Sequence, residues 1–489
     1  MRLFHSISGL RAALLPHRNQ QLGLVPTMGS LHAGHASLIQ QARSEADQVV
    51  VSIFVNPLQF GPNEDFADYP RQLEEDLALC DLMGVDYVFA PDPTDILGAE
   101  SLVQVVPPES MTNVLCGPGR PGFFTGVATI VTKLLNIVQP QLAYFGEKDA
   151  QQLAIIRRLV SDLNLPVEIR PCPIVRDSSG LALSSRNQYL SATQKAEATV
   201  LWRGLNQAKI LFSQEEQRGS ALIDAVFRTL AEAASVQVEY VELVEPNTLQ
   251  SLETVTTSGL LAVAAKVGSA RLIDNVVLRN RRPIIAIDGP ASSGKSTTTR
   301  LIAEKLGLFH LDTGAMYRAI AWLVQTQDIA LDDEAAIAEL VSEAKIELIP
   351  PRESHSQTLV IVNQQDVTLS IRTQEVTKLV SPLSALRCVR SQLLKQQQEI
   401  GRQGGVVAEG RDIGTHVFPD AELKIFLTAS VEERAKRRLQ EFYARGLTKL
   451  SIEQISRDIE ERDYRDSHRE IAPLRKAPDA IEINTDRLT

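Results

Sequence analysis

A glycine-rich stretch in the middle of the chain, Gly289-Pro-Ala-Ser-Ser-Gly-Lys-Ser296, has the complete pattern of a phosphate-binding loop. It follows the apolar run 284–288 and precedes the helix-like stretch 296–306, which is the strand–loop–helix context that the motif requires. Its glycines allow backbone N–H groups to surround phosphate oxygens at the start of a helix. More than half of the chain precedes this loop, which is enough for a separate protein.

The loop predicts an ATP site with a bound metal. Lys295 is expected to reach the β- and γ-phosphates, and the Ser296 hydroxyl is expected to hold Mg²⁺. The expected ATP-binding residues of the loop, besides Lys295, are Gly289, Ser292, Ser293, Gly294, Ser296 and Thr297.

Composition and charge argue against several classes of protein. A length of 489 residues favours about two to four domains, and 44% hydrophobic and 22% charged residues are ordinary for a globular protein. The net charge of −10 argues against nucleic acid as the main partner. Four widely spaced cysteines without a C-x-x-C pair favour free thiols in a reducing compartment. No apolar run reaches ~18 residues and the start lacks a signal-peptide core, so we expect a cytoplasmic protein without membrane contact.

Strand-like and helix-like segments alternate through the first half, which predicts a parallel α/β sheet. The strand-like runs are 22–25, 49–55, 87–90 and 142–145, and the helix-like runs are 31–46, 72–82 and 129–138. Residues 191–234 are mostly helical, and 236–244 and 260–267 are strand-like, as expected of a smaller α+β appendage. The charged segment 279–283 then predicts a short tether to the second half.

The sharpest feature of the first half is Pro26-Thr-Met-Gly-Ser-Leu-His-Ala-Gly-His35, which follows a strand and opens a helix. It places His32 and His35 near a helix N-terminus, and Gly34 leaves room for a ligand at the backbone. Two imidazoles in that field can donate hydrogen bonds to a triphosphate and stabilise charge as pyrophosphate leaves. Segments 146–152 and 183–186 add lysine, serine and arginine side chains.

Over residues 1–278 the sequence closely resembles pantoate–β-alanine ligases (pantothenate synthetases). The matching stretches are 25–35, 51–60, 63–71, 120–129, 145–149, 181–187 and 270–275. The resemblance implies that ATP adenylates the carboxylate of pantoate with release of pyrophosphate, and that β-alanine then attacks the mixed anhydride. It also implies a homodimer formed through this half.

The resemblance implies a role for individual residues. His32, His35 and Lys148 would be catalytic, and Gln59 and Gln152 would hold pantoate in an apolar pocket, since amides both donate and accept hydrogen bonds. The implied ATP-binding residues are Met28, Gly29, Gly34, Gly146, Glu147, Asp149, Val175, Leu183, Ser184, Ser185 and Arg186. One position departs from the family, because Phe123 stands where a histidine is often found.

Three polar clusters follow the phosphate-binding loop. Clusters 311–318 and 406–415 are each expected to follow a strand, and cluster 460–469 is rich in arginine and lies in a charged helical region. An isolated charged run is typical of a solvated helix face. Beside a phosphate loop, its arginines are instead expected to form a lid that compensates charge on a transferred phosphoryl group.

These clusters, with 370–376 and 418–421, resemble cytidylate kinases over residues 283–489. The resemblance implies ATP–Mg²⁺ as donor and CMP or dCMP as acceptor. Asp412, Arg462 and Arg469 would be catalytic beside Lys295, and Arg434 and Arg438 would lie at the ATP site. The implied CMP-binding residues are Thr313, Ser381, Arg390, Arg411 and Asp466, with Asp412 also on the acceptor side.

The expected fold class is therefore α/β throughout, with three domains. A Rossmann-like, nucleotidyltransferase-type domain at 1–178 is followed by a small α+β subdomain at 179–279. A P-loop nucleoside monophosphate kinase domain at 283–489 follows, with a monophosphate-binding insertion around 330–378 and a lid around 440–472. A fused bifunctional enzyme with two independent ATP sites is the interpretation that this organisation favours.

Two other interpretations stay open on the sequence. In the first, the first half is a general nucleotidyltransferase and the second an adenylate or shikimate kinase. The Gln59 and Gln152 pair and the Gly-Arg-Asp-Ile-Gly sequence at 410–414 argue against it. In the second, one half is a degenerate scaffold or nucleotide sensor, which the complete sets of motif residues argue against.

Overall fold

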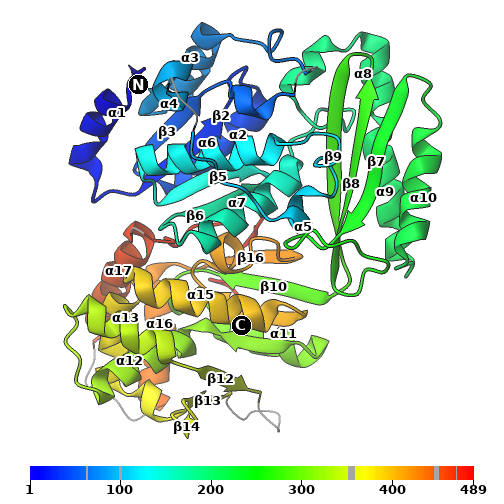
Figure 1. Cartoon of the computed structure of the whole chain (residues 1–489). Coiled ribbons are helices and arrows are strands. Elements are labelled where there is room, and N and C mark those ends of the chain that lie inside the picture. Colours follow the sequence, from blue (N-terminus) through cyan, green and yellow to red (C-terminus); the bar gives the residue numbers. More distant parts are fainter. Residues whose placement is uncertain (62–63, 99–101, 351–357, 445–450, 470, 489) are drawn as a thin grey trace. The chain divides into compact units, whose positions relative to one another are not determined.

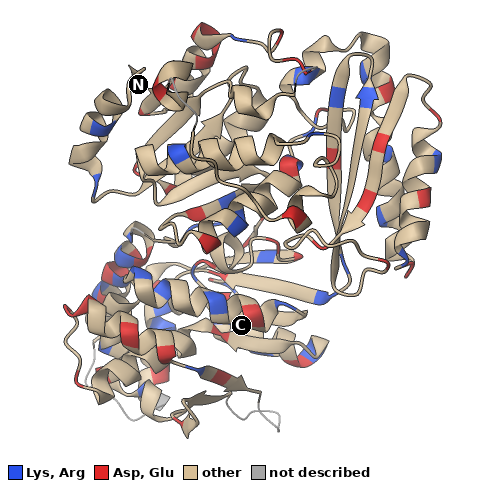
Figure 2. Ribbon diagram, in the orientation of Figure 1, with Lys and Arg blue, Asp and Glu red and all other residues tan. Residues whose placement is uncertain are grey.

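The computed structural model describes residues 1–61, 64–98, 102–350, 358–444, 451–469 and 471–488. The chain forms two compact units, Met1–Asn280 and Arg281–Thr489 (Figure 1). Acidic and basic residues are interspersed along the chain in both units (Figure 2). Among the described helices, none has the length and apolar character that a membrane span requires.

The first unit is built on a six-stranded parallel sheet whose two faces are covered by helices. Alternate strand residues face opposite cores: Leu24 packs with α1 and α6, whereas Val25 packs with α2. In sheet order the strands are β1 (Arg2–Phe4), β4 (Tyr87–Phe89), β3 (Gln48–Ile53), β2 (Leu22–Thr27), β5 (Leu142–Gly146) and β6 (Glu168–Cys172). The helices are α1 (Ile7–Leu14), α2 (Ala33–Glu45), α3 (Leu73–Leu82), α4 (Pro93–Leu97), α5 (Glu109–Thr112), α6 (Phe123–Val138) and α7 (Ala150–Asp162).

The strand order of this sheet reverses between β2 and β5. The chain runs from β2 to β3 and β4 on one side, and β5 and β6 then add on the other side. In an open parallel sheet, ligands bind at such a switch point, outside the carboxyl ends of the strands. The segments that follow β2 and β5 carry His32, His35 and Lys148, so the topology brings these side chains to one crevice.

The smaller part of the first unit is an antiparallel sheet covered by three helices. Strands β7 (Val236–Val244), β8 (Ser258–Val267) and β9 (Ala270–Arg279) form a meander. Helices α8 (Ala192–Ala198), α9 (Val200–Ser213) and α10 (Gly219–Leu230) supply a core of their own with these strands. Ile155 of α7 packs with Leu260 and Ala262 of β8, which joins the two parts of the unit.

The second unit is a five-stranded parallel sheet in the order β11 (Phe309–Asp312), β15 (Gly404–Gly410), β10 (Arg282–Asp288), β16 (Leu423–Thr428) and β17 (Ile481–Asn484). Cluster 406–415 was expected to follow a strand, but its first five residues lie in β15 itself. The reason is that β15 is an interior strand that pairs with both β10 and β11, so its hydrogen-bonded ladder continues to Gly410. The helices are α11 (Lys295–Leu306), α12 (Thr313–Thr326), α13 (Glu334–Glu343), α14 (Gln374–Leu383), α15 (Arg387–Gly401), α16 (Val431–Ala444) and α17 (Ile452–His468).

A small antiparallel sheet lies within the predicted insertion. Its strands are β12 (Ile346–Ile349), β13 (Leu359–Val362) and β14 (Gln365–Asp366). Residues 351–357 of the insertion, and 445–450 and 470 of the predicted lid, lie outside the described residues. The described part of the lid is mainly α17, which carries both acidic and basic residues along its length (Figure 2).

Only two residues separate the last strand of the first unit from the first strand of the second. The Asn280 side chain donates to the carbonyl oxygens of Val255 at 3.4 Å and Thr256 at 3.2 Å. The Arg281 guanidinium lies 2.9 Å from the Asp420 carboxylate and also pairs with Glu422. Each linker residue is thus bound to its own unit.

Residues 1–280 and 281–489, expressed separately, are expected to fold and each to keep its own reaction. Each piece has its own sheet and buried cores, and a domain of ~200 residues can bury enough surface to be stable alone. Thermal melts and activity assays on the two pieces test this. Pieces that are insoluble or inactive alone, and that recover on co-expression, would contradict it.

Candidate active sites

A cavity of about 1370 Å³ opens at the switch point of the first unit. It brings together residues from both parts of the unit, including His32 and His35 after β2, Lys148 after β5 and Arg271 of β9. The predicted residues that line it are Met28, His32, Gly34, His35, Gln59, Gly146, Lys148, Asp149, Gln152, Val175, Leu183, Ser184, Ser185 and Arg186. Two further predicted residues, Gly29 and Glu147, do not line this cavity.

The two histidines form the N-terminal cap of α2. The backbone N–H of Gly34 donates to Nδ1 of His32 at 3.1 Å, and the backbone N–H of His32 donates to Nδ1 of His35 at 3.3 Å. Since both Nδ1 atoms accept, a neutral ring carries its proton on Nε2. A methyl group on Gly34 would lie 2.8 Å from the His32 ring, so glycine makes this arrangement possible.

Both imidazoles are neutral near pH 7. Burial and the nearby Lys148 charge lower the pKa of His32 to about 4. Burial, followed by His32 and Lys148, lowers the pKa of His35 to about 3. The ring centroids are 4.1 Å apart, and so close a pair does not take up two positive charges. The pair can therefore donate two hydrogen bonds from Nε2 without itself being charged.

The segment before these histidines is held by a buried carboxylate. Asp76 of α3 accepts hydrogen bonds from the backbone N–H groups of Ser30 at 2.9 Å and Leu31 at 2.7 Å. Gly29 has a φ of +80°, and a side chain there would meet the Asp76 carboxylate at 2.9 Å. Gly29 therefore shapes the turn that leads into the histidines.

Strand β9 holds the Lys148 segment in place. The Asn275 side chain donates to the carbonyl oxygens of Glu147 and Lys148, each at 3.0 Å. The neighbouring Asp274 binds Arg176 through two hydrogen bonds of 2.6 and 2.8 Å. Burial lowers the pKa of Lys148. Stretch 270–275 is one of those that carry the family resemblance, but no site role was predicted for Asp274 or Asn275.

Arg186 and the serines before it reach the cavity from the segment after β6. Arg186 forms two hydrogen bonds of 2.9 Å with Asp65, and Ser184 caps its turn by accepting from the Arg186 backbone N–H at 3.3 Å. The Leu183 backbone N–H donates to Val175 at 2.9 Å, which places these two cavity residues side by side. Asn63 of stretch 63–71 lies outside the described residues.

The two predicted amide residues also reach the cavity. The Asn56 side chain donates to Oε1 of Gln59 at 3.0 Å, which fixes which end of that amide accepts. Gln152 lines the cavity, whereas its neighbour Gln151 is buried and binds the backbone of Cys116, Met111 and Val114. Helix α6 contributes Val127, Ile130, Val131 and Leu134 to the apolar part of the lining.

Phe123 at the start of α6 takes part in a cation–π contact. The Arg120 guanidinium carbon lies 3.6 Å from the centre of the Phe123 ring. Arg120 also pairs with Glu64 at 2.6 Å and donates to the Gln59 carbonyl at 2.9 Å. The aromatic residue thus packs against an arginine that braces the Gln59 segment, and it offers no polar group of its own.

The phosphate-binding loop of the second unit has the backbone that its sequence requires. Gly289 and Gly294 have φ values of +148° and +93°, and a side chain at Gly289 would meet the Leu427 carbonyl at 2.1 Å. Lys295 donates to the Pro290 carbonyl at 2.6 Å, and Ser296 donates to the Glu409 carboxylate at 2.6 Å. Burial lowers the pKa of Lys295. Ser292, Ser293 and Thr297 belong to the same loop and the start of α11.

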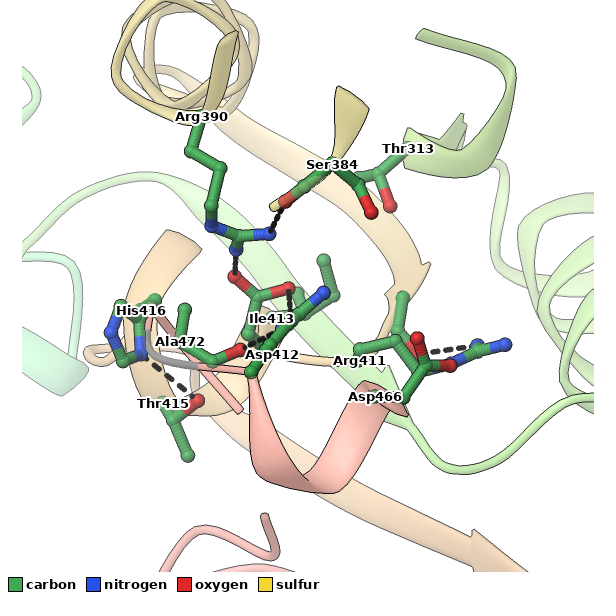
Figure 3. A network of polar contacts seen from close by, with 12 residues as sticks. Thr313, Ser384, Arg390, Arg411, Asp412, Ile413, Thr415, His416, Asp466 and Ala472 are labelled. Carbon is green, nitrogen blue, oxygen red and sulfur yellow. Dashed lines mark hydrogen bonds and ion pairs between the residues drawn. The ribbon is translucent and has the colours of Figure 1, made fainter. Parts of the chain in front are cut away.

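A network of ion pairs surrounds Asp412, as Figure 3 shows. Asp412 pairs with Arg390, which also donates to the Ser384 carbonyl, and with Arg469 at 3.2 Å. Arg411 pairs with Asp466 of α17 at 2.8 Å, and Arg462 lies 3.9 Å from the same carboxylate.

Two predicted residues lie beside this network. Thr313 donates to the Glu409 carbonyl at 2.7 Å. Ser381 lies on α14, where its carbonyl accepts from Ser384 at 2.9 Å. The predicted acceptor residues therefore come together from α12, α14, α15, the segment after β15 and the lid.

The two arginines predicted at the ATP site differ in their surroundings. Arg434 is only 3% exposed, pairs with Asp463 at 2.6 Å and donates to the Ala291 carbonyl of the phosphate-binding loop at 3.3 Å. Arg438 pairs with Glu441 at 2.8 Å and packs on Phe442. No site role was predicted for Asp463 or Glu409, which bind Arg434 and Ser296. Glu409 is the penultimate residue of β15, next to the strand that leads into the phosphate-binding loop, and this position was the available signal.

A family model described as pantoate-β-alanine ligase matches residues 2–277, and one described as cytidylate kinase matches residues 285–489. A protein of Trichormus variabilis named bifunctional pantoate ligase/cytidylate kinase is 59% identical over 474 residues, which is 96% of this chain and 89% of that protein. The chain belongs to the bifunctional pantoate ligase/cytidylate kinase family.

Further comparisons agree with this family. A bifunctional pantoate ligase/cytidylate kinase of Synechocystis is 57% identical and covers 100% of this chain and 96% of its own. The crystal structure of pantothenate synthetase from Thermus thermophilus has a TM-score of 0.55 at 43% identity, and the match covers 56% of this chain and 99% of that one. The predicted resemblance and the predicted α/β fold class are confirmed.

Proposed function

We propose a residue-level assignment of the two activities that this family combines, with pantoate ligation in residues 1–280 and cytidylate phosphorylation in 281–489. The first activity is the ATP-dependent condensation of pantoate with β-alanine. The second is the ATP-dependent phosphorylation of CMP or dCMP. The finer domain division follows the sequence: 1–178 and 179–279 for the ligase, and 283–489 for the kinase with its insertion and lid.

In the ligase, a carboxylate oxygen of pantoate attacks the α-phosphorus of ATP and pyrophosphate leaves. Charge grows on the departing phosphates, where His32 and His35 donate from Nε2 and Lys148 supplies a positive charge. Gln59 and Gln152 hold pantoate, and the β-alanine amine then attacks the acyl carbon and releases AMP. The observation that carries this assignment is a single cavity lined by the paired neutral histidines, Lys148 and both glutamines.

The other ligase residues are assigned to binding ATP. Met28, Gly34, Gly146, Asp149, Val175 and the 183–186 segment supply the cavity wall around it. Gly29 and Glu147 stay predictions, and the geometry supports a shaping role for Gly29 in the turn.

In the kinase, a phosphate oxygen of CMP attacks the γ-phosphorus of ATP and ADP leaves. Lys295 and the backbone of residues 289–297 bind ATP, and Arg434 stabilises that loop through its hydrogen bond to the Ala291 carbonyl. Thr313, Ser381, Arg390, Arg411, Asp412 and Asp466 bind the acceptor. Arg462 and Arg469 compensate charge on the phosphoryl group in transit.

We further propose Mg²⁺ as the divalent metal of the ATP used at both sites. In the kinase, the Ser296 hydroxyl and the Glu409 carboxylate are 2.6 Å apart and supply the hard oxygen ligands that Mg²⁺ prefers. The described residues contain no cluster of three or more His, Cys, Asp or Glu side chains suited to a metal. Mg²⁺ usually binds through one or two protein groups and the substrate phosphates, where it neutralises charge on the transferred group.

Two assays on the purified full-length protein test this proposal. AMP release is measured with pantoate plus β-alanine, and ADP release with CMP, each with the omission of one substrate as control. A panel of AMP, shikimate, dCMP and UMP tests the alternative acceptors, and efficient use of AMP or shikimate instead of CMP would overturn the assignment.

We also expect a cytoplasmic homodimer formed through the ligase half. Sedimentation of residues 1–280 tests the dimer.

Asp412→Asn is expected to raise KM for CMP by about 10-fold or more while KM for ATP changes little. The carboxylate pairs with both Arg390 and Arg469, and a hydrogen bond to a charged group contributes about 1.5–3 kcal/mol. Steady-state kinetics with each substrate varied in turn measure this. A rise confined to the KM for ATP would remove Asp412 from the acceptor side.

A further inference from the structure

A buried carboxylate joins the phosphate-binding loop to the segment that carries Arg411 and Asp412. Asp288 is the last residue of β10, directly precedes Gly289 and is only 4% exposed. Its Oδ1 accepts a hydrogen bond from the backbone N–H of Ile413 at 2.8 Å, and its Oδ2 accepts one from Gly414 at 2.7 Å. Both oxygens of one carboxylate are thus used to hold a single turn.

The two N–H groups need a partner from outside the turn. Ile413–Val417 forms a π-helical turn in which the N–H groups of His416 and Val417 donate to the Asp412 carbonyl. The first N–H groups of a helical turn have no acceptor within it. Asp288 supplies that acceptor in a buried site, where an unpaired N–H is costly.

The sheet brings the two segments together. Strands β10 and β15 are parallel neighbours, with Asp288 opposite Gly410. After Gly410 the chain presents Arg411 and Asp412, which enter the ion-pair network with Asp466, Arg390 and Arg469. The Asp288 carboxylate therefore fixes the residues that immediately follow the acceptor-binding pair.

We propose that Asp288 is a positioning residue that couples the donor loop to the acceptor segment: by holding Ile413 and Gly414, its carboxylate sets the placement of Arg411 and Asp412 against the nucleoside monophosphate. This inference rests on the proposed cytidylate kinase function of residues 281–489. Asp288 acts through the backbone that it binds and does not touch the substrate.

The protonation of Asp288 gives this role a distinctive signature. Burial, helped by the Asp412 charge, raises the pKa of Asp288 to about 6, although the two N–H groups and Lys295 oppose the rise. Lys424 of β16 faces the same turn, and it pairs with Asp479 at 2.9 Å. A protonated carboxyl presents a hydroxyl donor at one oxygen, so one of the two N–H groups loses its acceptor. Efficient use of CMP is therefore expected to decline as the pH falls through about 6.

Stability responds to the same proton in the opposite direction. The pKa of Asp288 is higher in the folded protein than the ordinary value of 3.8, so the folded state binds the proton more tightly. The stabilisation is complete below pH 3.8 and is lost as the pH rises through about 6. At low pH, protonation of Asp288 therefore stabilises the fold and weakens the use of CMP. A residue with only a structural role would not show these two opposite effects.

The test compares Asp288→Asn with the parental full-length enzyme. Asparagine has one oxygen acceptor and one NH₂ donor and so imitates the protonated acid. At pH 7.5 we expect kcat/KM for CMP to fall about 10-fold, chiefly through KM for CMP, with KM for ATP changed less than about 3-fold. Asp420→Asn, an exposed carboxylate that accepts from the Arg281 guanidinium at 2.9 Å, is the matched control and should leave both constants unchanged.

The decisive measurement is the ratio of variant to parental kcat/KM for CMP between pH 5 and 8. Titration of the CMP phosphate, near pH 6, cancels in this ratio. The ratio should rise towards one below about pH 6, because the parental enzyme loses the same hydrogen bond there. A constant ratio, or equal rises in the KM for ATP and CMP, would overturn the proposal.

If Asp288→Asn does not fold, Asp288→Glu takes its place. Asp288→Glu keeps the negative charge, so it should raise the KM for CMP and retain the pH dependence of the parental enzyme. An unchanged KM for CMP in Asp288→Glu would also overturn the proposal. Failure of the parental enzyme to use CMP would instead refute the proposed function.

Discussion

Lys295→Ala is expected to lower phosphoryl transfer from ATP to CMP by on the order of 10³-fold, while ligase activity stays within a few-fold of the parental value. Lys295 is only 6% exposed, and its ammonium group donates to the Pro290 carbonyl within the loop that would hold the phosphates. Burial, with the Arg411 charge next in importance, lowers the pKa of Lys295. The negative charge of the phosphates would offset the cost of burying the Lys295 ammonium group, so its positive charge is most favourable when ATP is bound.

The measurement uses one protein preparation for both reactions, ADP release with CMP and AMP release with pantoate plus β-alanine. Lys305→Ala is the matched control, because Lys305 lies in the last turn of the same helix and is exposed. Near-parental CMP phosphorylation by Lys295→Ala would remove the lysine from the mechanism. A parallel loss of ligase activity would show that the two units are not independent.

His35→Ala and Lys148→Ala are each expected to lower pantoate-dependent pyrophosphate release by about 10²–10³-fold, the cost of one preorganised donor to a developing charge. Both side chains line the same cavity, and the phosphorylation of CMP should continue at the parental rate. Lys209→Ala on the exposed face of α9 is the control for loss of a lysine.

His35→Ala also removes a helix cap, which costs about 0.5–2 kcal/mol of stability in typical cases. His32→Asn separates the two effects, because asparagine is a good N-cap acceptor but cannot place a donor where His32 Nε2 lies. This variant should melt near the parental temperature and still adenylate pantoate about 10²-fold more slowly. Near-parental adenylation by His32→Asn or His35→Ala would mean that these histidines serve the fold alone.

The sequence predicted the strands and the order of motifs well, because these depend on local patterns. The apolar run 22–25 lies in β2 and 142–145 lies in β5, and complete motifs placed the histidines and Lys295 at the ends of strands. The helix predicted over 129–138 begins earlier, at Phe123, because Gly122 takes a left-handed conformation and residues 123–128 continue the apolar face.

Tertiary contacts were not predictable in the same way. Asn275 holds the Lys148 segment from a strand more than a hundred residues away, and Arg434 supports a loop that lies far from it in the sequence. Neither contact leaves a local signal, because an asparagine in a strand and an arginine in a charged helix are both common. The site assignments themselves stay predictions until the variants are measured.

The histidine cap of α2 ties the start of a helix to the chemistry of the first unit. A serine with a glutamate three residues later would start the same helix at least as well. Such a replacement would leave the protein folded and deprive it of both Nε2 donors. Mutations that replace the histidines with a more ordinary helix start would therefore keep the stability of the fold but abolish the activity. Selection on pantothenate supply, and not on folding, is what would keep this pair in place.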